Sequence, residues 1–386
     1  MERFHSLNAA RVCAEFCVVH YHLSFVGGGG LLSSDELSAN LMSFFFVLSG
    51  FVTMHSQRDV DLAPFAAKAA FVRRRLSKVY PTYLIWYLLD LPGSLMHGWT
   101  TTAGRCPLTF GLALASQPLL LLQPWLGCRP IANEASWYLA TLCWLWLLFA
   151  LLNPRSWLET RPWAKLFALY LVSQALWATL GPVFHASHLR AVPLLRLPEF
   201  LMGGCVAFTV DRPLPWARWG MALGGLVLVV YTIVHFFHAV VDPEHEAEAC
   251  ALWPVRRSRA RYYYGDTLFL SKFALLWCLV VHGLVAGELA GDRPWECLGW
   301  LNAFSLQMYL SHHTVAKGLY TLSKLVGLAP CWSMSTLVLA CYYVAYRYSL
   351  FEPRLLLAMW RRSDADASSD YEPAVLRLMT QAPSSS

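Results

Sequence analysis

Residues 135–152 read ASWYLATLCWLWLLFALL and contain no charged side chain. A helix of about 20 apolar residues is long enough to cross the hydrocarbon core of a lipid bilayer. This stretch therefore predicts a membrane-spanning helix. The whole chain has the same character, because 57% of its 386 residues are hydrophobic and 14% are charged, whereas charged residues make up about 25% of a soluble globular domain.

Similar apolar segments recur along the chain, separated by polar or Pro/Gly-rich stretches. Together they predict an all-α fold, a polytopic transmembrane helix bundle of about ten spans. The expected spans are residues 8–26, 40–56, 79–96, 135–152, 164–184, 194–210, 219–240, 267–289, 297–316 and 330–350. Residues 107–126 are a further candidate, but their Gln-Pro pairs favour an interfacial or re-entrant segment.

The distribution of basic residues predicts a cytoplasmic N-terminus. The second and third expected spans are joined by a segment with six basic residues, namely Arg58, Lys68, Arg73, Arg74, Arg75 and Lys78. The preceding loop, GGGGLLSSDELSAN, has no lysine or arginine. Cytoplasmic loops are enriched in these residues. The arginine-rich loop at 241–266 is then external and runs against the rule.

The domain organisation expected from this pattern is simple. Residues 1–360 form one transmembrane domain, and residues 361–386 form a disordered cytosolic tail. The protein is expected in the plasma membrane or an endomembrane. Its net charge of +6 comes from basic residues beside apolar segments, so we expect the lipid bilayer, and no nucleic acid, as a partner.

Ionisable residues inside the first expected span are the strongest functional signal. At 100° per residue, Arg11, Glu15 and His22 fall within roughly 60° of one another on a helix, whereas His20 points the opposite way. Such groups cost about 3 kcal/mol each in a membrane and normally face a protein or water-lined interior. A structural Arg11–Glu15 ion pair beside a satisfied core histidine explains the pattern about as well.

Two further stretches carry polar residues in apolar surroundings. The sequence FVRRRLSKVYPTY, residues 71–83, places Arg74, Arg75 and Lys78 within one turn, where they can bind phosphate groups. Ordinary charge at the membrane flank is the simpler explanation.

The stretch NAFSLQMYLSHH, residues 302–313, aligns four polar side chains on one helical face: Asn302, Ser305, Tyr309 and His312. That face should point into the bundle, although interhelical hydrogen bonding alone can explain it. Arg196 and Glu199 are likewise too costly for a lipid-facing site.

The order of these motifs resembles that of the acyltransferase-3 superfamily of membrane-bound acyltransferases. The family's Arg-(ten residues)-His element corresponds to Arg11 and His22, and its FFVLSGF signature to residues 45–51. The other matching elements are the basic element with Arg74, Arg75 and Lys78 before Pro81 and Tyr83, the tryptophan motif at Trp137, and the stretches RLPEFLMGG, FSLQMYLSH and FEP.

This resemblance implies an enzyme that moves an acyl group, often acetyl, from acyl-CoA to a hydroxyl of a carbohydrate, lipid or small metabolite. His22 is then the general base, assisted by Arg11 and Glu15. The CoA phosphates are bound by Arg74, Arg75 and Lys78, and the substrate pocket is formed by Ser49, Trp137, Glu199, Tyr309 and His312. Acyl-CoA is a co-substrate, and no permanently bound cofactor or metal is expected.

Two departures from the family pattern leave other functions open. Leu142 stands where the motif W-S-L-x-x-E has a carboxylate, and Lys78 stands where the basic element ends in arginine. An inactive relative is therefore one alternative. A proton-coupled transporter or flippase is another, because buried ionisable residues also suit proton transport, although no internal symmetry of the kind found in many transporters is evident.

Overall fold

The computed structural model describes residues 4–27, 35–102, 117, 122, 124–125, 132–133, 135–180, 189–210, 273–291, 305–326 and 334–360. Within these ranges the regular structure is entirely helical, which confirms the all-α prediction. The helices are α1 (His5–Gly27), α2 (Asp35–Ser56), α3 (Phe65–Thr102), α5 (Ser136–Leu152), α6 (Arg155–Glu159), α7 (Pro162–Leu180), α9 (Pro193–Val206), α13 (Ala274–Leu289), α14 (Ser305–Leu325) and α15 (Met334–Trp360).

Most of the expected spans coincide with these helices, although several bounds differ, chiefly those of α3, α14 and α15, the last of which ends at Trp360 rather than at residue 350. Helix α3 begins at Phe65 and continues through Pro81 and Pro92, so the basic element lies on a helix rather than in a loop. The alanine- and arginine-rich start of this segment favours helix. Helix α14 extends to Leu325. The expected end at residue 316 was too early because the second half of the helix is polar.

Several predictions lie outside the described residues: the span at 219–240, the loop at 241–266, nearly all of residues 107–126, and the tail at 361–386. Among the helices that are described, none combines the length and the apolar character required of a membrane span.

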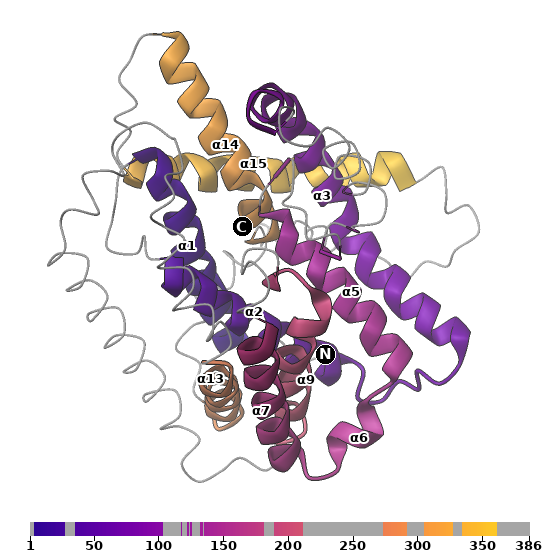
Figure 1. The fold of residues 1–386 in the computed structure, drawn as a ribbon. Coiled ribbons are helices and arrows are strands. Elements are labelled where there is room, and N and C mark those ends of the chain that lie inside the picture. Colours follow the sequence, from indigo (N-terminus) through magenta and orange to yellow (C-terminus); the bar gives the residue numbers. More distant parts are fainter. Residues whose placement is uncertain are drawn as a thin grey trace, which may run out of the picture.

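Helices α2 and α9 pack against each other at the centre of one half of the bundle (Figure 1). Two glycines allow this close approach. A Cβ atom on Gly50 would lie 1.8 Å from the backbone oxygen of Phe200, and one on Gly203 would lie 1.9 Å from that of Val47. Helix α7 covers α9, and α13 contacts α1, α2, α7 and α9. At Gly50 and Gly203, only a residue without a Cβ atom is compatible with the close backbone contact between α2 and α9.

The other half of the bundle is built around α14, which contacts α1, α3 and α15 (Figure 1). Its apolar contacts form a separate cluster in which Val19 and Leu23 of α1 pack with Met308 of α14 and Cys341 of α15. Helix α1 contacts both α2 and α14. It therefore connects the two halves, with one side on each.

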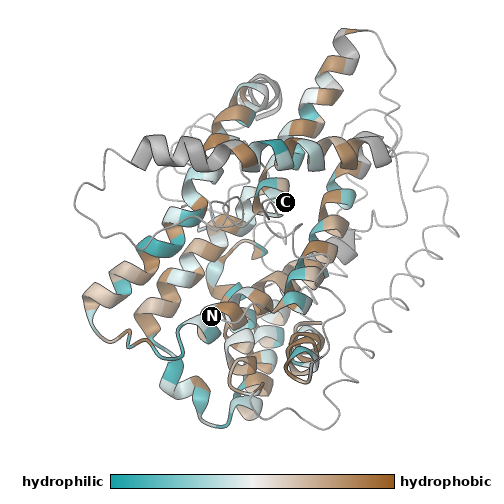
Figure 2. Cartoon of the chain, turned by 180° about the vertical axis from the view of Figure 1, so that it is seen from behind, coloured by the Kyte–Doolittle hydropathy of each residue, from teal (hydrophilic) through white to brown (hydrophobic). Residues whose placement is uncertain are grey.

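Apolar residues also occupy outward-facing positions. In Figure 2 they occur along the helices that form the outside of the bundle. On α7, for example, Phe167, Leu171 and Val172 are 52%, 51% and 49% exposed. Contiguous apolar surface of this kind marks a region that contacts another protein or a membrane.

Candidate functional site

The polar face of α1 points into the bundle. Glu15 is buried and accepts a hydrogen bond from the Ser305 hydroxyl of α14. Half-buried Arg11 interacts electrostatically with Glu15. Through its hydrogen bond, Ser305 joins Glu15 to the face of α14 that the sequence singled out.

His22 lies further along the same face, against two histidines of α14. Its ring centroid is 5.2 Å from that of His312 and 4.6 Å from that of His313. His20 instead lies beside Phe16, which is 37% exposed, with ring centroids 6.2 Å apart. The helical geometry thus selects His22 as the histidine that faces the interior.

Tyr138, at the start of α5, connects the FFVLSGF motif to this face. Its hydroxyl lies 2.9 Å from the Ser49 hydroxyl and 3.3 Å from the Phe45 carbonyl oxygen, to which it donates. It also interacts electrostatically with Arg11, and its ring lies 5.8 Å from that of Tyr309. Ser49 is therefore linked to the site through Tyr138.

Tyr309 continues the connection towards the histidines. Its hydroxyl donates a hydrogen bond of 2.7 Å to the Ala135 carbonyl, and its ring lies 6.0 Å from that of His312. Arg190 closes the other side, with its guanidinium 5.3 Å from the centroid of the Trp137 ring. This cation interacts electrostatically with both His22 and Tyr309, so it faces the same interior.

We call this group of residues the α1–α14 polar cluster. It consists of Arg11, Glu15, His22, Ser49, Trp137, Tyr138, Arg190, Tyr309, His312 and His313. The sequence predicted seven of these ten and missed Tyr138, Arg190 and His313. Asn302, which shares the predicted face, lies outside the described residues.

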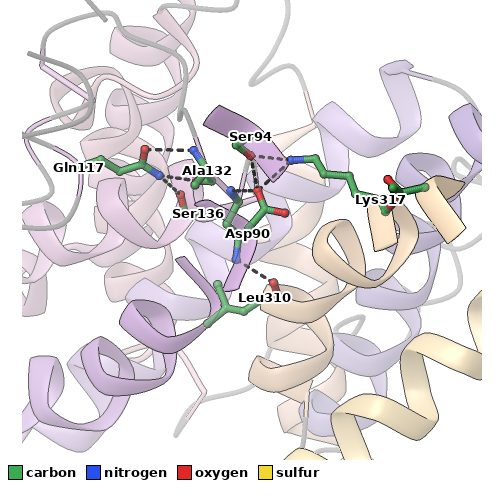
Figure 3. Close-up of polar contacts among 9 residues, drawn as sticks. Asp90, Ser94, Gln117, Ala132, Ser136, Leu310 and Lys317 are labelled. Atoms are coloured by element: carbon green, nitrogen blue, oxygen red, sulfur yellow. Dashed lines mark hydrogen bonds and ion pairs between the residues drawn. The ribbon is translucent and has the colours of Figure 1, made fainter. Parts of the chain in front are cut away.

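A buried aspartate holds the segment before α5 against α14 (Figure 3). One carboxylate oxygen of Asp90 accepts hydrogen bonds from Lys317 at 2.8 Å, Ser94 at 2.7 Å and the Asn133 amide at 2.7 Å. The Asn133 side chain donates to the Leu310 carbonyl at 2.7 Å. This network fixes the start of α5, and with it Trp137 and Tyr138, beside α14.

A second set of hydrogen bonds supports the same segment (Figure 3). The Gln117 amide donates to the Ala132 carbonyl at 2.5 Å and to the Ser136 hydroxyl at 3.2 Å. The Tyr83 hydroxyl donates to the Gln117 carbonyl at 2.8 Å. The polar start of α5 is therefore tied to α3 as well as to α14.

The sequence contains a signal for this aspartate but not for its partner. Asp90 is a single carboxylate within the apolar run YLIWYLLDLPG, and a lone charge in such a run calls for a partner of opposite charge. That partner, Lys317, is 227 residues away. No local pattern reveals it.

The basic element divides into one anchored and two exposed cations. Arg75 donates a hydrogen bond of 2.8 Å to the Ser56 hydroxyl, and its guanidinium lies 5.6 Å from the centroid of the Trp146 ring. Burial, with a smaller effect of Arg74, lowers the pKa of Arg75 to about 10, which leaves it charged at neutral pH. Arg74 and Lys78 are exposed and available to an anionic ligand.

Glu199 occupies a different environment from the other predicted site residues. Its carboxylate pairs with Arg196 at 2.9 Å, both side chains being at most 1% exposed, and accepts a hydrogen bond of 3.2 Å from Ser43. Arg196 and Glu199 both belong to α9, and the bond from Ser43 joins the pair to α2. The structure therefore assigns Glu199 to that helix contact and not to the α1–α14 polar cluster.

Comparison with known sequences defines the class of this helical protein. The sequence profile of the acyltransferase 3 family, described as an acyltransferase domain, matches residues 4–346. The chain therefore belongs to this family of acyltransferases.

One characterised relative is similar over most of its length. It is "Acyltransferase MdmB" of Streptomyces mycarofaciens, 26% identical over 325 residues that cover 70% of this chain and 76% of the relative. No solved structure shows significant similarity to the chain.

Proposed function

We propose that this protein is an integral membrane O-acyltransferase that moves an acyl group, in the simplest case acetyl, from acyl-CoA to a hydroxyl of a carbohydrate, lipid or small metabolite. The observation that carries the proposal is the position of His22. It lies on the inner face of α1 in a chain of the acyltransferase 3 family, surrounded by Arg190 and two histidines. Histidine is the side chain that exchanges protons near neutral pH.

The reaction needs one proton to be moved twice. His22 accepts the proton of the acceptor hydroxyl, and the resulting oxygen nucleophile attacks the thioester carbonyl. The carbon–sulfur bond then breaks, and the imidazolium returns the proton to the CoA thiolate. A positioned base of this kind contributes about 100- to 10,000-fold in rate. In this proposal Arg190, which interacts electrostatically with His22, stabilises the negative charge that develops on the carbonyl oxygen.

The remaining residues have supporting roles in this proposal. Arg74, Arg75 and Lys78 bind the phosphates of CoA, since charge-assisted hydrogen bonds are the stronger kind. Arg11 and Glu15, joined to α14 through Ser305, hold α1 in register. Ser49, Tyr138, Tyr309 and Trp137 shape the acceptor pocket.

A location in a lipid bilayer is supported by composition and surface. The chain is 57% hydrophobic, and outward-facing apolar side chains such as Leu88, Leu89 and Leu339 are 53%, 57% and 68% exposed. Leaving such surface in water is unfavourable by about 25 cal/mol per Å². Membrane lipid removes that cost.

The direct test is acyl transfer by purified protein in detergent or nanodiscs, supplied with radiolabelled acetyl-CoA and a panel of hydroxylated acceptors. His22→Ala should reduce transfer by about 100- to 10,000-fold without changing protein yield. His20→Ala is the matched control, because His20 lies on the same helix but beside exposed Phe16. Full activity of His22→Ala would refute the mechanism.

The same preparation separates the rival functions. Flux of an acceptor across a proteoliposome membrane without CoA release would indicate a transporter. Absence of both transfer and flux over a broad panel would indicate a relative that has lost activity. Leu142 and Lys78, the two departures from the family pattern, would then be the first residues to test as its cause.

A further inference from the structure

Three histidines lie close together at one end of the α1–α14 polar cluster. His22 comes from α1, and His312 and His313 are consecutive on α14. One ring nitrogen from each lies within 4.8 Å of the other two. The His312 and His313 ring centroids are 4.7 Å apart. Consecutive residues on a helix point about 100° apart. The His22 ring can therefore lie between the rings of His312 and His313 and contact both.

The nitrogens that face this meeting point are available as ligands. The Nδ1 atom of His312 lies 3.3 Å from the Met308 carbonyl oxygen. A proton on Nδ1 directed to that oxygen leaves the lone pair on Nε2, the arrangement that orients metal-binding histidines. Within the described part of the chain, the buried Nε2 atoms of His312 and His313 have no hydrogen-bond partner. Buried polar atoms of this kind are rare and call for an explanation.

We propose that His22, His312 and His313 form a binding site for a divalent transition-metal ion, with Zn²⁺ as the ion that suits three imidazoles best. In a tetrahedral Zn²⁺ site with bonds of about 2.0–2.1 Å, ligand nitrogens are about 3.3 Å apart. The ligand nitrogens of the three histidines are now up to 4.8 Å apart. Small side-chain rotations would bring them to the separation that Zn²⁺ requires. The fourth position is left to water or another small ligand.

Two cations lie near the site. Arg190 interacts electrostatically with His22, and its guanidinium lies 5.3 Å from the centroid of the Trp137 ring. His22 and His313 are half-buried, so the site is accessible on the side where those two rings meet. Lys317 interacts electrostatically with His313, but its charge is paired with Asp90 at 2.8 Å. The competing explanation is that the three rings only pack against one another, in which case the chain binds no metal ion.

The site has a consequence for activity that rests on the proposed function. A metal ion bound to His22 occupies the lone pair that the general base needs. Zn²⁺ should therefore inhibit acyl transfer reversibly, and a chelator should restore it. Metal binding itself is measured without acyl donor, so it stands or falls independently of the enzyme activity.

The binding experiment uses the purified full chain, stripped with a chelator, incubated with Zn²⁺ and desalted before elemental analysis, with titration calorimetry for affinity. We expect about one ion per chain. His313→Ala should weaken binding by at least about tenfold, since changes outside the ligand shell alone cost about 10- to 100-fold. His313→Gln serves as the second variant if the alanine variant is poorly folded.

His282→Ala is the matched control. His282 is also buried and its Nε2 atom also has no partner within the described residues, but it lies on α13 with Nδ1 3.0 Å from the Thr209 hydroxyl. Binding should be unchanged in this variant. Failure of the wild-type chain to retain Zn²⁺, or equal binding by His313→Ala and wild type, would overturn the proposal.

The activity arm keeps the two proposals apart. If Zn²⁺ binds at the histidines and inhibits transfer by the wild type, while the remaining activity of His313→Ala is insensitive to Zn²⁺, the inhibitory role is supported. Binding without any acyl transfer would retain the metal site and reject the proposed function. Transfer that is unaffected by bound Zn²⁺ would reject the inhibitory role.

Discussion

The Arg196–Glu199 pair of α9 and the histidines of α14 are both buried polar groups, but they differ in how their hydrogen bonds are satisfied. Between α2 and α9, both oxygens of Glu199 accept hydrogen bonds from Arg196, at 2.9 and 3.1 Å, and one accepts a further bond from Ser43. The Arg196 guanidinium also donates to the Arg190 carbonyl at 2.9 Å. The bond from Ser43 joins this pair of α9 to α2, and these two helices already touch at Gly50 and Gly203.

Between α1 and α14, in contrast, buried nitrogens of His312 and His313 have no hydrogen-bond partner within the described residues. His22 beside them is half-buried. A satisfied polar group stabilises a fold, whereas an unsatisfied one costs free energy and is retained where a ligand or a reaction uses it. The comparison therefore assigns a structural role to the Arg196–Glu199 pair and chemistry to the histidines of the α1–α14 polar cluster.

The largest expected effect on stability is that of removing the charge of Glu199. Glu199→Gln leaves the Arg196 guanidinium buried without its counter-ion, which costs about 3 to 5 kcal/mol. We expect a clear fall in thermal stability and in the yield of folded protein. Acyl transfer per folded molecule should change little. A loss of turnover at unchanged stability would move Glu199 into the active site.

Gly203→Ala tests the same helix contact sterically. The new methyl group would lie 1.9 Å from the Val47 carbonyl oxygen, so α2 and α9 would have to separate, at a cost of about 1 to 3 kcal/mol or more. Gly93→Ala is the control, because a Cβ there meets nothing within 4 Å. Equal thermal stability of the two variants, measured by scanning fluorimetry, would contradict the packing described here.

The exposed cations of α3 should affect binding of the acyl donor rather than stability. Replacing Lys78 with alanine removes one charge-assisted contact worth about 1.5 to 3 kcal/mol, which raises KM for acetyl-CoA by about 10- to 100-fold at similar kcat. Arg73→Ala is the matched control on the same exposed helix segment. An unchanged KM for Lys78→Ala would place the CoA phosphates elsewhere.

Tyr138→Phe should have the smallest effect. It removes the hydroxyl that lies 2.9 Å from Ser49 and 3.3 Å from the Phe45 carbonyl, at a net cost of about 0.5 to 1.5 kcal/mol. The ring and its contact with Tyr309 remain. Steady-state kinetics with varied acceptor should show a modest rise in KM. A loss as large as that of His22→Ala would give Tyr138 a direct role in the reaction.

The helices were largely predictable because apolar runs and helical periodicity are local properties of the sequence. The first helix shows this best, since the spacing of Arg11, Glu15 and His22 fixed their common face before any partner was known. The end of α14 was missed for the same reason. Its second half contains Lys317 and other polar residues, and an apolar criterion stops before them.

The partners across helices were not predictable. The bond from Lys317 to Asp90 joins positions 227 residues apart, and that from Ser305 to Glu15 joins positions 290 apart. Periodicity also could not decide that His313, as well as His312, would reach His22. Those contacts depend on how α1 and α14 pack, which a single helical face does not specify.

The most direct test of the account is a paired measurement on His22→Ala and Glu199→Gln, recording acyl transfer from labelled acetyl-CoA and thermal stability on the same preparations. We predict that His22→Ala loses about 100-fold or more of the activity at wild-type stability, while Glu199→Gln loses stability but retains turnover per folded molecule. The opposite pattern, an active His22→Ala or an inactive but fully stable Glu199→Gln, would contradict the structural role given to Glu199 and the chemical role given to His22.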